Sequence, residues 1–115
     1  MISDDVMMVA RRDFGEEQFG GVMAVLSEYG VEKWEREKAR VQLAALKLAN
    51  GDREAIKKHI AVAKQDYRHV LAAAEYPEYF RYGMFRVREL PAKVQQLIID
   101  SDWNRYQTWL SRRFK

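Results

Sequence analysis

The chain has 115 residues, which at roughly 100–150 residues per domain leaves room for a single domain. It contains no cysteine, which excludes disulfides, thiolate metal sites and cysteine nucleophiles, and its 48% of hydrophobic residues is too high for an intrinsically disordered protein. The formal net charge of +3 is unevenly distributed along the chain. Residues 59–115 contain 10 Lys and Arg and 6 Asp and Glu, whereas residues 1–58 contain 10 Lys and Arg and 11 Asp and Glu. This mild asymmetry permits a polyanionic partner without requiring one.

The N-terminal part is predicted to contain an arm or short helix and then an amphipathic helix. Residues 1–15 are the arm or short helix, and its apolar side chains Val6, Val9 and Ala10 would face the core. Residues 16–29 form the amphipathic helix, because apolar side chains recur there at helical spacing. A capping-box-like pair would start this helix and a glycine would end it. The stripe is Phe19, Val22, Met23, Leu26 and Tyr29, the pair is Asp13 and Glu16, and the glycine is Gly30.

The next predicted helix covers residues 31–49 and changes character midway. Residues 32–38 are mostly charged, and we interpret them as a solvent-exposed first turn anchored by Trp34, with an acidic partner surface as the alternative. Residues 41–49 are apolar around most of the circumference, which predicts that this half lies at the centre of a bundle. Asn50-Gly51-Asp52 combines a helix stop with a new N-cap and therefore predicts a tight helical hairpin.

A long helix is predicted from Asp52 to Tyr76, where Pro77 would end it. Straight, it would be about 36 Å long at 1.5 Å per residue, which is long for a chain of this size and predicts a kink near residues 64–66. Residues 77–90 show no clean period, and we interpret them as an ordered connector. The apolar stripe of the long helix consists of Ile56, Ile60, Ala63, Tyr67, Val70 and Ala74.

The last predicted helix starts with Pro91 in its first turn. It carries two apolar stripes whose centres differ by about 120° when about 100° per residue is counted. The phase changes near residues 100–102, which predicts either a break with Ser101 as a new N-cap or an unbroken helix that is contacted from two sides. One stripe is Val94, Leu97 and Ile98, and the other is Ile99, Trp103, Tyr106 and Leu110.

Together these elements predict an all-α protein, with a single domain over residues 1–115 built as an antiparallel bundle of about four or five helices. Residues 41–49 would form its hub. No run approaches the roughly 18 apolar residues of a membrane span, and the acidic pair Asp4-Asp5 does not resemble a signal peptide. We therefore expect a cytoplasmic protein without a membrane partner.

Two stretches of the chain resemble a family of small uncharacterised bacterial proteins. Residues 43–52 read L-A-A-L-K-L-A-N-G-D and residues 66–77 read D-Y-R-H-V-L-A-A-A-E-Y-P. The family has the same wording, L-A-x-L-K-L-A-x-G-D and D-Y-R-x-V-L-A-x-A-E-Y-P, with a Trp- and Tyr-containing tail like residues 102–110. The resemblance covers about residues 30–110 and implies a small, bacterial, cytoplasmic protein. It transfers no catalytic residue, because it brings no activity with it.

Asp66 and His69 form the most enzyme-like pair in the chain, since they lie three residues apart on one helix face as in the carboxylate and histidine ligands of di-iron bundles. Such a site needs a second copy of the motif and two more carboxylates. The other histidine, His59, lies ten residues earlier and about 80° away around the helix axis. Glu35 or Glu37 could add oxygens, but both lie in the charged run that we interpret as solvent-exposed. A surface network in which Arg68 pairs with Asp66 or Glu75 is therefore the preferred interpretation. No nucleophile elbow and no phosphate-binding glycine loop occurs. We assign no catalytic residue, no metal ligand and no cofactor.

The C-terminal third is rich in aromatic residues and arginines, with nine of the chain's 14 aromatic residues in residues 76–115. Tyr, Trp and Arg are enriched in protein interaction hot spots, although many of these rings would also fill the core. We expect a non-catalytic protein-interaction or regulatory module, with a homodimer as one possible form of it. The alternative is a nucleic-acid-binding accessory protein. A small carboxylate- or metal-dependent enzyme ranks third. The candidate surface is Tyr79, Arg81, Tyr82, Arg86, Arg88, Trp109, Arg112 and Arg113.

Overall fold

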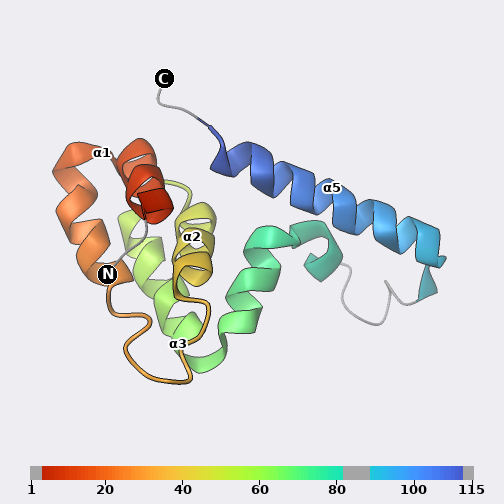
Figure 1. Cartoon of the computed structure of the whole chain (residues 1–115), viewed down its shortest axis with the longest axis horizontal. Coiled ribbons are helices and arrows are strands. Elements are labelled where there is room, and N and C mark those ends of the chain that lie inside the picture. Colours follow the sequence, from red (N-terminus) through yellow and green to blue (C-terminus); the bar gives the residue numbers. More distant parts are fainter. Residues whose placement is uncertain (1–3, 82–88, 113–115) are drawn as a thin grey trace. The chain divides into compact units, whose positions relative to one another are not determined.

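The computed structural model describes residues 4–81 and 89–112, and every regular element in these ranges is a helix (Figure 1). The all-α prediction is therefore confirmed. The chain forms two compact units, Met1–Leu71 and Ala72–Lys115. The antiparallel order of the helices and the single domain over residues 1–115 stay predictions. Within the described ranges, no helix has both the length and the apolar character that a bilayer span requires.

Helix α1 runs from Asp4 to Leu26 and is kinked at Gly15, whose backbone adopts φ 78° and ψ 167°. The predicted N-terminal helix is confirmed as the first part of α1, and its three inward-facing residues are fully buried. The predicted boundary at residues 13–16 is confirmed, because the backbone of Gly15 leaves the helical conformation and a second helical segment of α1 begins after it. The Asp13 carboxylate is bound by Arg12, whose Nε lies 2.9 Å from it.

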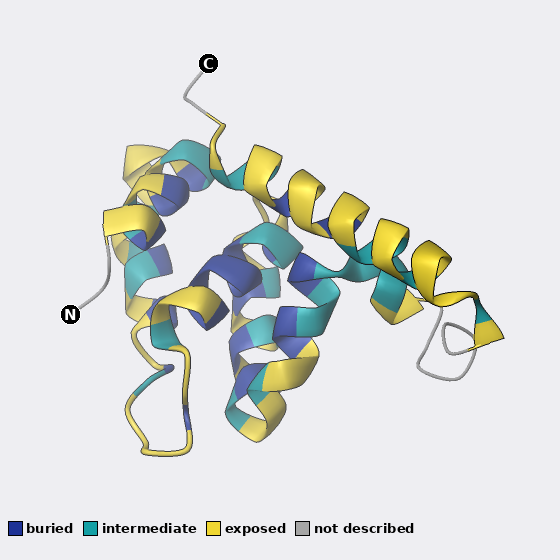
Figure 2. Cartoon of the chain, turned by 45° about the vertical axis from the view of Figure 1, so that its right-hand side comes forward, coloured by how far each residue is buried: buried dark blue, intermediate teal, exposed yellow. Residues whose placement is uncertain are grey.

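Helix α2 covers Lys38–Ala49 and packs against α1. The prediction that a helix starts at residue 31 is wrong, since residues 31–37 form an irregular loop. The prediction for residues 41–49 is confirmed in that most of them are buried, which Figure 2 shows as the dark blue stretch of α2. Among them is one polar side chain, Gln42, whose Nε2 donates a hydrogen bond to the Leu26 carbonyl at 2.9 Å.

The predicted hairpin after α2 is confirmed. Asn50 and Gly51 both adopt positive φ, at 49° and 84°, which stops the helix. The Asp52 carboxylate then accepts a hydrogen bond from the Glu54 N–H at 3.0 Å, as an N-cap does. The chain therefore turns directly from α2 into α3.

Helix α3 covers Arg53–Glu75, so it ends just before Pro77 as predicted. The predicted kink is confirmed at Asp66, where φ is −153° and ψ is 95°. The Asp66 carboxylate accepts the Arg68 N–H at 3.1 Å and thereby caps the second part of the helix. A short helical turn, residues 77–81, follows α3.

Helix α5 covers Ala92–Leu110 and follows Pro91, in agreement with the predicted start. It continues without a break through residues 100–102, so the alternative with Ser101 as a new N-cap is wrong. An unbroken helix places two differently phased apolar stripes on different faces of the same rod. The surroundings of these two faces decide what α5 can bind.

Candidate binding surface on α5

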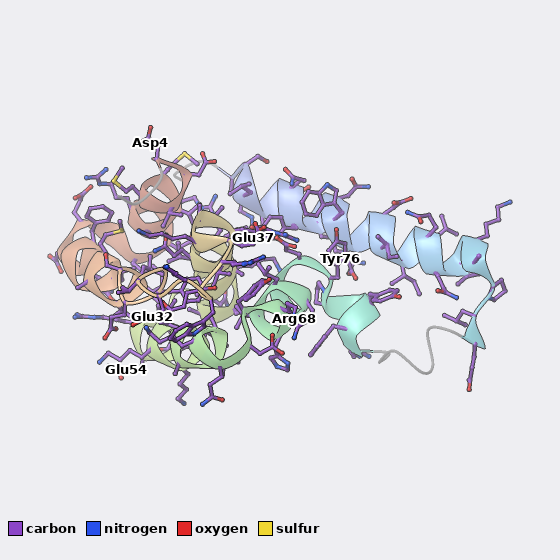
Figure 3. All side chains as sticks on the ribbon, turned by 60° about the horizontal axis from the view of Figure 1, so that its bottom comes forward. Asp4, Glu32, Glu37, Glu54, Arg68 and Tyr76 are labelled. Carbon is purple, nitrogen blue, oxygen red and sulfur yellow. The ribbon has the colours of Figure 1, made fainter. Side chains whose placement is uncertain are left out.

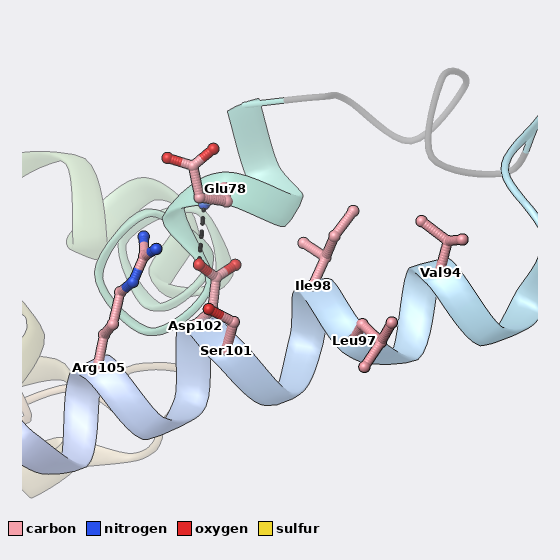
Figure 4. Close-up of a pocket in the computed structure, with 7 residues that line it drawn as sticks. All are labelled: Glu78, Val94, Leu97, Ile98, Ser101, Asp102 and Arg105. Atoms are coloured by element: carbon pink, nitrogen blue, oxygen red, sulfur yellow. Dashed lines mark hydrogen bonds between the residues drawn. The ribbon is translucent and has the colours of Figure 1, made fainter.

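One face of α5 is joined to the turn 77–81 by a buried carboxylate. The Asp102 side chain, in a residue with 1% of its surface exposed, accepts hydrogen bonds from the N–H groups of Glu78 at 3.3 Å and Tyr79 at 2.9 Å. These N–H groups belong to the first turn of a helix and therefore have no acceptor within that helix. Pro77 before them has no N–H group that would need an acceptor. Asp102 thus caps the turn from another helix. Figure 4 shows its contact with Glu78 as a dashed line.

The same face carries a row of aromatic rings. Trp103 stacks on Tyr76 with ring centroids 6.0 Å apart and on Tyr106 at 5.6 Å. Tyr106, which is buried, also contacts Trp109 at 5.5 Å. These distances lie in the favourable range for aromatic pairs. Of these four rings only Trp109 was a predicted site residue, and its contact with Tyr106 makes it part of this row.

The other stripe of α5 is open. Leu97 has 63% and Val94 has 38% of its surface exposed, and Ile98 is half-buried beside them. A pocket of about 420 Å³ lies along this stripe, bounded by the turn 77–81 on one side. Figure 4 shows the residues that line it: Glu78, Val94, Leu97, Ile98, Ser101, Asp102 and Arg105. We call Val94, Leu97, Ile98, Ser101 and Arg105 the α5 stripe.

The charges around the pocket are mixed. Arg105 is exposed at one end of the α5 stripe, and it has no ion-pair partner among residues 4–81 and 89–112. Glu78 lies beside the pocket, and one of its carboxylate oxygens is 3.7 Å from Arg81 Nη1. The lining thus combines three apolar side chains with the Arg105 cation and the carboxylates of Glu78 and Asp102. The apolar side chains and Arg105 together suit an apolar segment that carries an acidic group.

The structure describes four of the eight predicted site residues and divides them between two places. Tyr79 and Arg81 belong to the turn 77–81, whereas Trp109 and Arg112 lie at the C-terminal end of α5 and just beyond it. The remaining four, Tyr82, Arg86, Arg88 and Arg113, lie outside the described residues, so the predicted surface is untested as a whole. The apolar centre of the pocket, Val94 and Leu97, was not among the predicted site residues. The sequence feature that pointed to Val94 and Leu97 was the phase difference between the two apolar stripes of the last predicted helix.

Asp66 and His69 behave as the preferred interpretation predicted. The Asp66 carboxylate pairs with Arg68 Nε at 3.2 Å, and this hydrogen bond lowers the pKa of Asp66. Arg68, which Figure 3 labels on α3, is exposed, and so is His69. Within the described ranges, no group of three His, Asp or Glu side chains is placed to hold a metal ion.

A second buried carboxylate organises the loop before α2. Glu35 accepts hydrogen bonds from the N–H groups of Gly30 and Val31, both at 3.0 Å, and of Glu32 at 3.2 Å. Its other oxygen is 3.0 Å from Lys64 Nζ on α3. Because Glu35 holds these three N–H groups outside a helix, residues 31–37 do not continue into α2 as a helical turn.

The environment of Glu35 corrects a second prediction about this loop. Trp34 does not anchor it, since 63% of its surface is exposed, whereas Glu35 is buried. Burial raises the pKa of the Glu35 carboxyl, but hydrogen bonds from Lys64 and from the three backbone N–H groups outweigh burial and lower it overall. The buried residue in this charged run is therefore an ionised acid.

Comparison of the chain with protein-family models, curated proteins and solved structures finds no match. The resemblance of residues 43–52 and 66–77 to a bacterial family stays a prediction.

Proposed function

We propose that the protein is a small, non-catalytic protein-interaction module and that it binds its partner through the α5 stripe. The observation that carries the proposal is the exposure of Leu97, at 63%, beside Val94 on an unbroken helix whose other stripe is already occupied. A single exposed apolar residue is ordinary on a protein surface, but an apolar row along a pocket is typical of a binding groove.

The chemistry of the stripe favours a protein partner. An apolar helix face with side chains at i, i+3 and i+4 matches the way in which an amphipathic helix docks on another protein. Arg105, exposed at the edge, would select a partner segment with an acidic residue at that position. The buried Asp102 cap supports binding by keeping the turn 77–81 in place as the wall of the pocket.

The alternative, a nucleic-acid-binding accessory protein, depends on arginines that are free to contact phosphates. Of the predicted arginines that the structure describes, Arg81 lies 3.7 Å from Glu78, and Arg112 also has an interaction partner. The open stripe of α5 carries three apolar side chains, Val94, Leu97 and Ile98, and a single arginine, Arg105. A protein partner is therefore the proposal that the described residues support better.

The proposal is tested by comparing three forms of the protein as bait against an extract of its own cells. We expect the wild type and Gln107→Glu to retain the same proteins, and Leu97→Glu to lose at least one of them. Leu97 and Gln107 are both exposed on α5, so both substitutions should leave the fold intact. The retained protein is then purified, and its binding should show the negative heat-capacity change of apolar burial.

Equal retention of all proteins by Leu97→Glu and Gln107→Glu would contradict the proposal. The alternative has its own signature: binding to a single-stranded oligonucleotide that weakens steeply as salt is raised, and a shallower salt dependence for Arg81→Ala. That result would move the function to nucleic acid.

A further inference from the structure

The α5 stripe has the spacing of a seam between two helices. Val94, Leu97 and Ser101 follow one another at intervals of three and four residues, which is the a and d pattern of paired helices. The stripe is apolar in the first half of α5, continues in the small side chain of Ser101 and has Arg105 at its far end. A helix that lies across Val94 and Leu97 would therefore meet a narrow seam without steric obstruction by a large polar residue.

Two opposite charges lie along one edge of this seam. Lys93 and Asp100 are seven residues apart, so at about 100° per residue they differ by only about 20° around the helix axis. Both are exposed. The Asp100 carboxylate accepts a hydrogen bond from Gln96 Nε2 at 2.8 Å, which restricts its position. Lys93 has no ion-pair partner in the described part of the chain.

This arrangement is complementary to its own copy. When two identical helices pack antiparallel, the residues along one edge face the same edge of the partner helix in reverse order. A two-fold axis near residue 96 would bring Lys93 of each copy beside Asp100 of the other. The same axis would place Val94 of each copy against Leu97 of the other. One register therefore satisfies the charges and the apolar side chains together.

We propose that the protein binds a second copy of itself through an antiparallel pair of α5 helices, with Val94 and Leu97 in the seam and Lys93 and Asp100 paired across it. This inference rests on the proposed function, because it names the occupant of the α5 stripe. A parallel pair is the less favourable arrangement, since it would place Lys93 beside the partner's apolar Ile98 and would align the two helix dipoles.

The first experiment is a charge exchange measured by sedimentation at increasing protein concentration. The wild type should pass from the chain mass of 13.6 kDa to twice that value. Lys93→Asp and Asp100→Lys should each weaken association about tenfold, because each replaces two attractive pairs per dimer by repulsive ones. The double variant should regain most of the wild-type affinity. Lys58→Asp, at an exposed site on α3, is the matched control and should associate like the wild type.

The second experiment tests the direction of the pair by cross-linking. The chain has no cysteine, so Leu97→Cys and Thr108→Cys each introduce a single thiol. Under mild oxidation Leu97→Cys should form a disulfide-linked dimer. Thr108→Cys should not, because the two thiols of an antiparallel pair would lie on the order of 35 Å apart. Efficient linkage of both variants would show a parallel pair and overturn this register.

The outcomes separate this inference from the proposed function. A wild type that remains a monomer at millimolar concentration overturns self-association. If Leu97→Glu then still loses a protein that Gln107→Glu retains, the interaction module stands and its partner is a different protein. If Leu97→Glu loses nothing, both proposals fail. Single variants that are not rescued by the double exchange overturn the pairing of Lys93 with Asp100.

Discussion

The carboxylate of Asp102 lies 2.9 Å from the backbone nitrogen of Tyr79, although the two residues are 23 positions apart. This contact is a helix cap that one segment supplies to another. A local cap would need a Ser, Thr, Asp or Asn directly before Pro77, and the sequence has Tyr76 there. The position of the turn 77–81, and with it the wall of the pocket, depends on this one side chain.

Replacing Asp102 should loosen that turn. Asp102→Ala leaves two N–H groups without their acceptor and should lower the free energy of unfolding by about 1–3 kcal/mol. Asp102→Asn, which keeps one acceptor oxygen, should cost less. Hydrogen exchange at the Glu78 and Tyr79 amides should rise in Asp102→Ala. The control is Asp100→Ala at an exposed position, which should leave these two amides protected.

The loop before α2 should depend on Glu35 in the same manner. Glu35→Ala removes the acceptor of three backbone N–H groups and the partner of Lys64, and it should cost about 2–4 kcal/mol in the free energy of unfolding. Glu37→Ala is a matched control, because Glu37 is exposed and 3.8 Å from Arg40. Chemical denaturation measures both. Equal costs for the two variants would contradict the anchoring role of Glu35.

Lowering the pH should remove the contribution of Glu35 to the stability of the folded protein. Its pKa is lowered in the folded protein from an ordinary value of 4.5, so the folded state favours the ionised form. The associated stability is present above that ordinary value and is lost as the pH falls through the lower pKa of the folded state. The stability difference between the wild type and Glu35→Gln should therefore be constant near neutral pH and should shrink below pH 4.5. A difference that is independent of pH would contradict this assignment.

Raising the pH into the alkaline range should remove the contribution of Tyr29 to the stability of the folded protein. Its hydroxyl donates a hydrogen bond to the Arg36 carbonyl at 2.6 Å, and burial, with the nearby Glu35 charge, raises its pKa from 10.0 to about 12. A raised pKa means that the stability contribution is complete below pH 10 and is lost as the pH rises toward 12. Tyr29→Phe should cost about 1 kcal/mol at neutral pH.

The same variant gives the alkaline test. Because Tyr29→Phe lacks the titrating group, the stability of the wild type should fall toward that of the variant between pH 10 and 12. Parallel stability curves for the two proteins across this range would show that Tyr29 ionises equally in the folded and unfolded states.

Helix periodicity and local stop signals predicted much of the fold. The Asn50-Gly51-Asp52 hairpin, the end of α3 before Pro77 and the start of α5 after Pro91 all depend on residues within one turn of the boundary, so they can be predicted from the local sequence. The kink at Asp66 followed from helix length, and an Asp at that position can cap the helix that restarts.

The helix boundary that was predicted wrongly depends on contacts with residues far away in the sequence. Residues 31–37 carry a helical charge pattern, yet Glu35 binds three N–H groups of the loop and a lysine 29 positions away. The open pocket likewise depends on Asp102 reaching the turn 77–81. Glu35 and Asp102 look like ordinary surface acids in the sequence, because nothing local shows that a tertiary contact will bury them. The periodicity did show two stripes on α5, but it could not show which of them stays open.

The buried amide of Gln42 bears on how α2 finds a unique packing. The neighbouring residues of α2 are mostly Ala, Leu and Val, and such a smooth cylinder can rotate about its axis or slide by a turn at little energetic cost. Gln42 restricts this freedom through its Nε2, because a rotation of α2 would separate that nitrogen from the Leu26 carbonyl; its Oε1 is buried without a hydrogen-bond partner in the described part of the chain. Gln42 thus selects one rotational setting among several that the aliphatic side chains alone would tolerate.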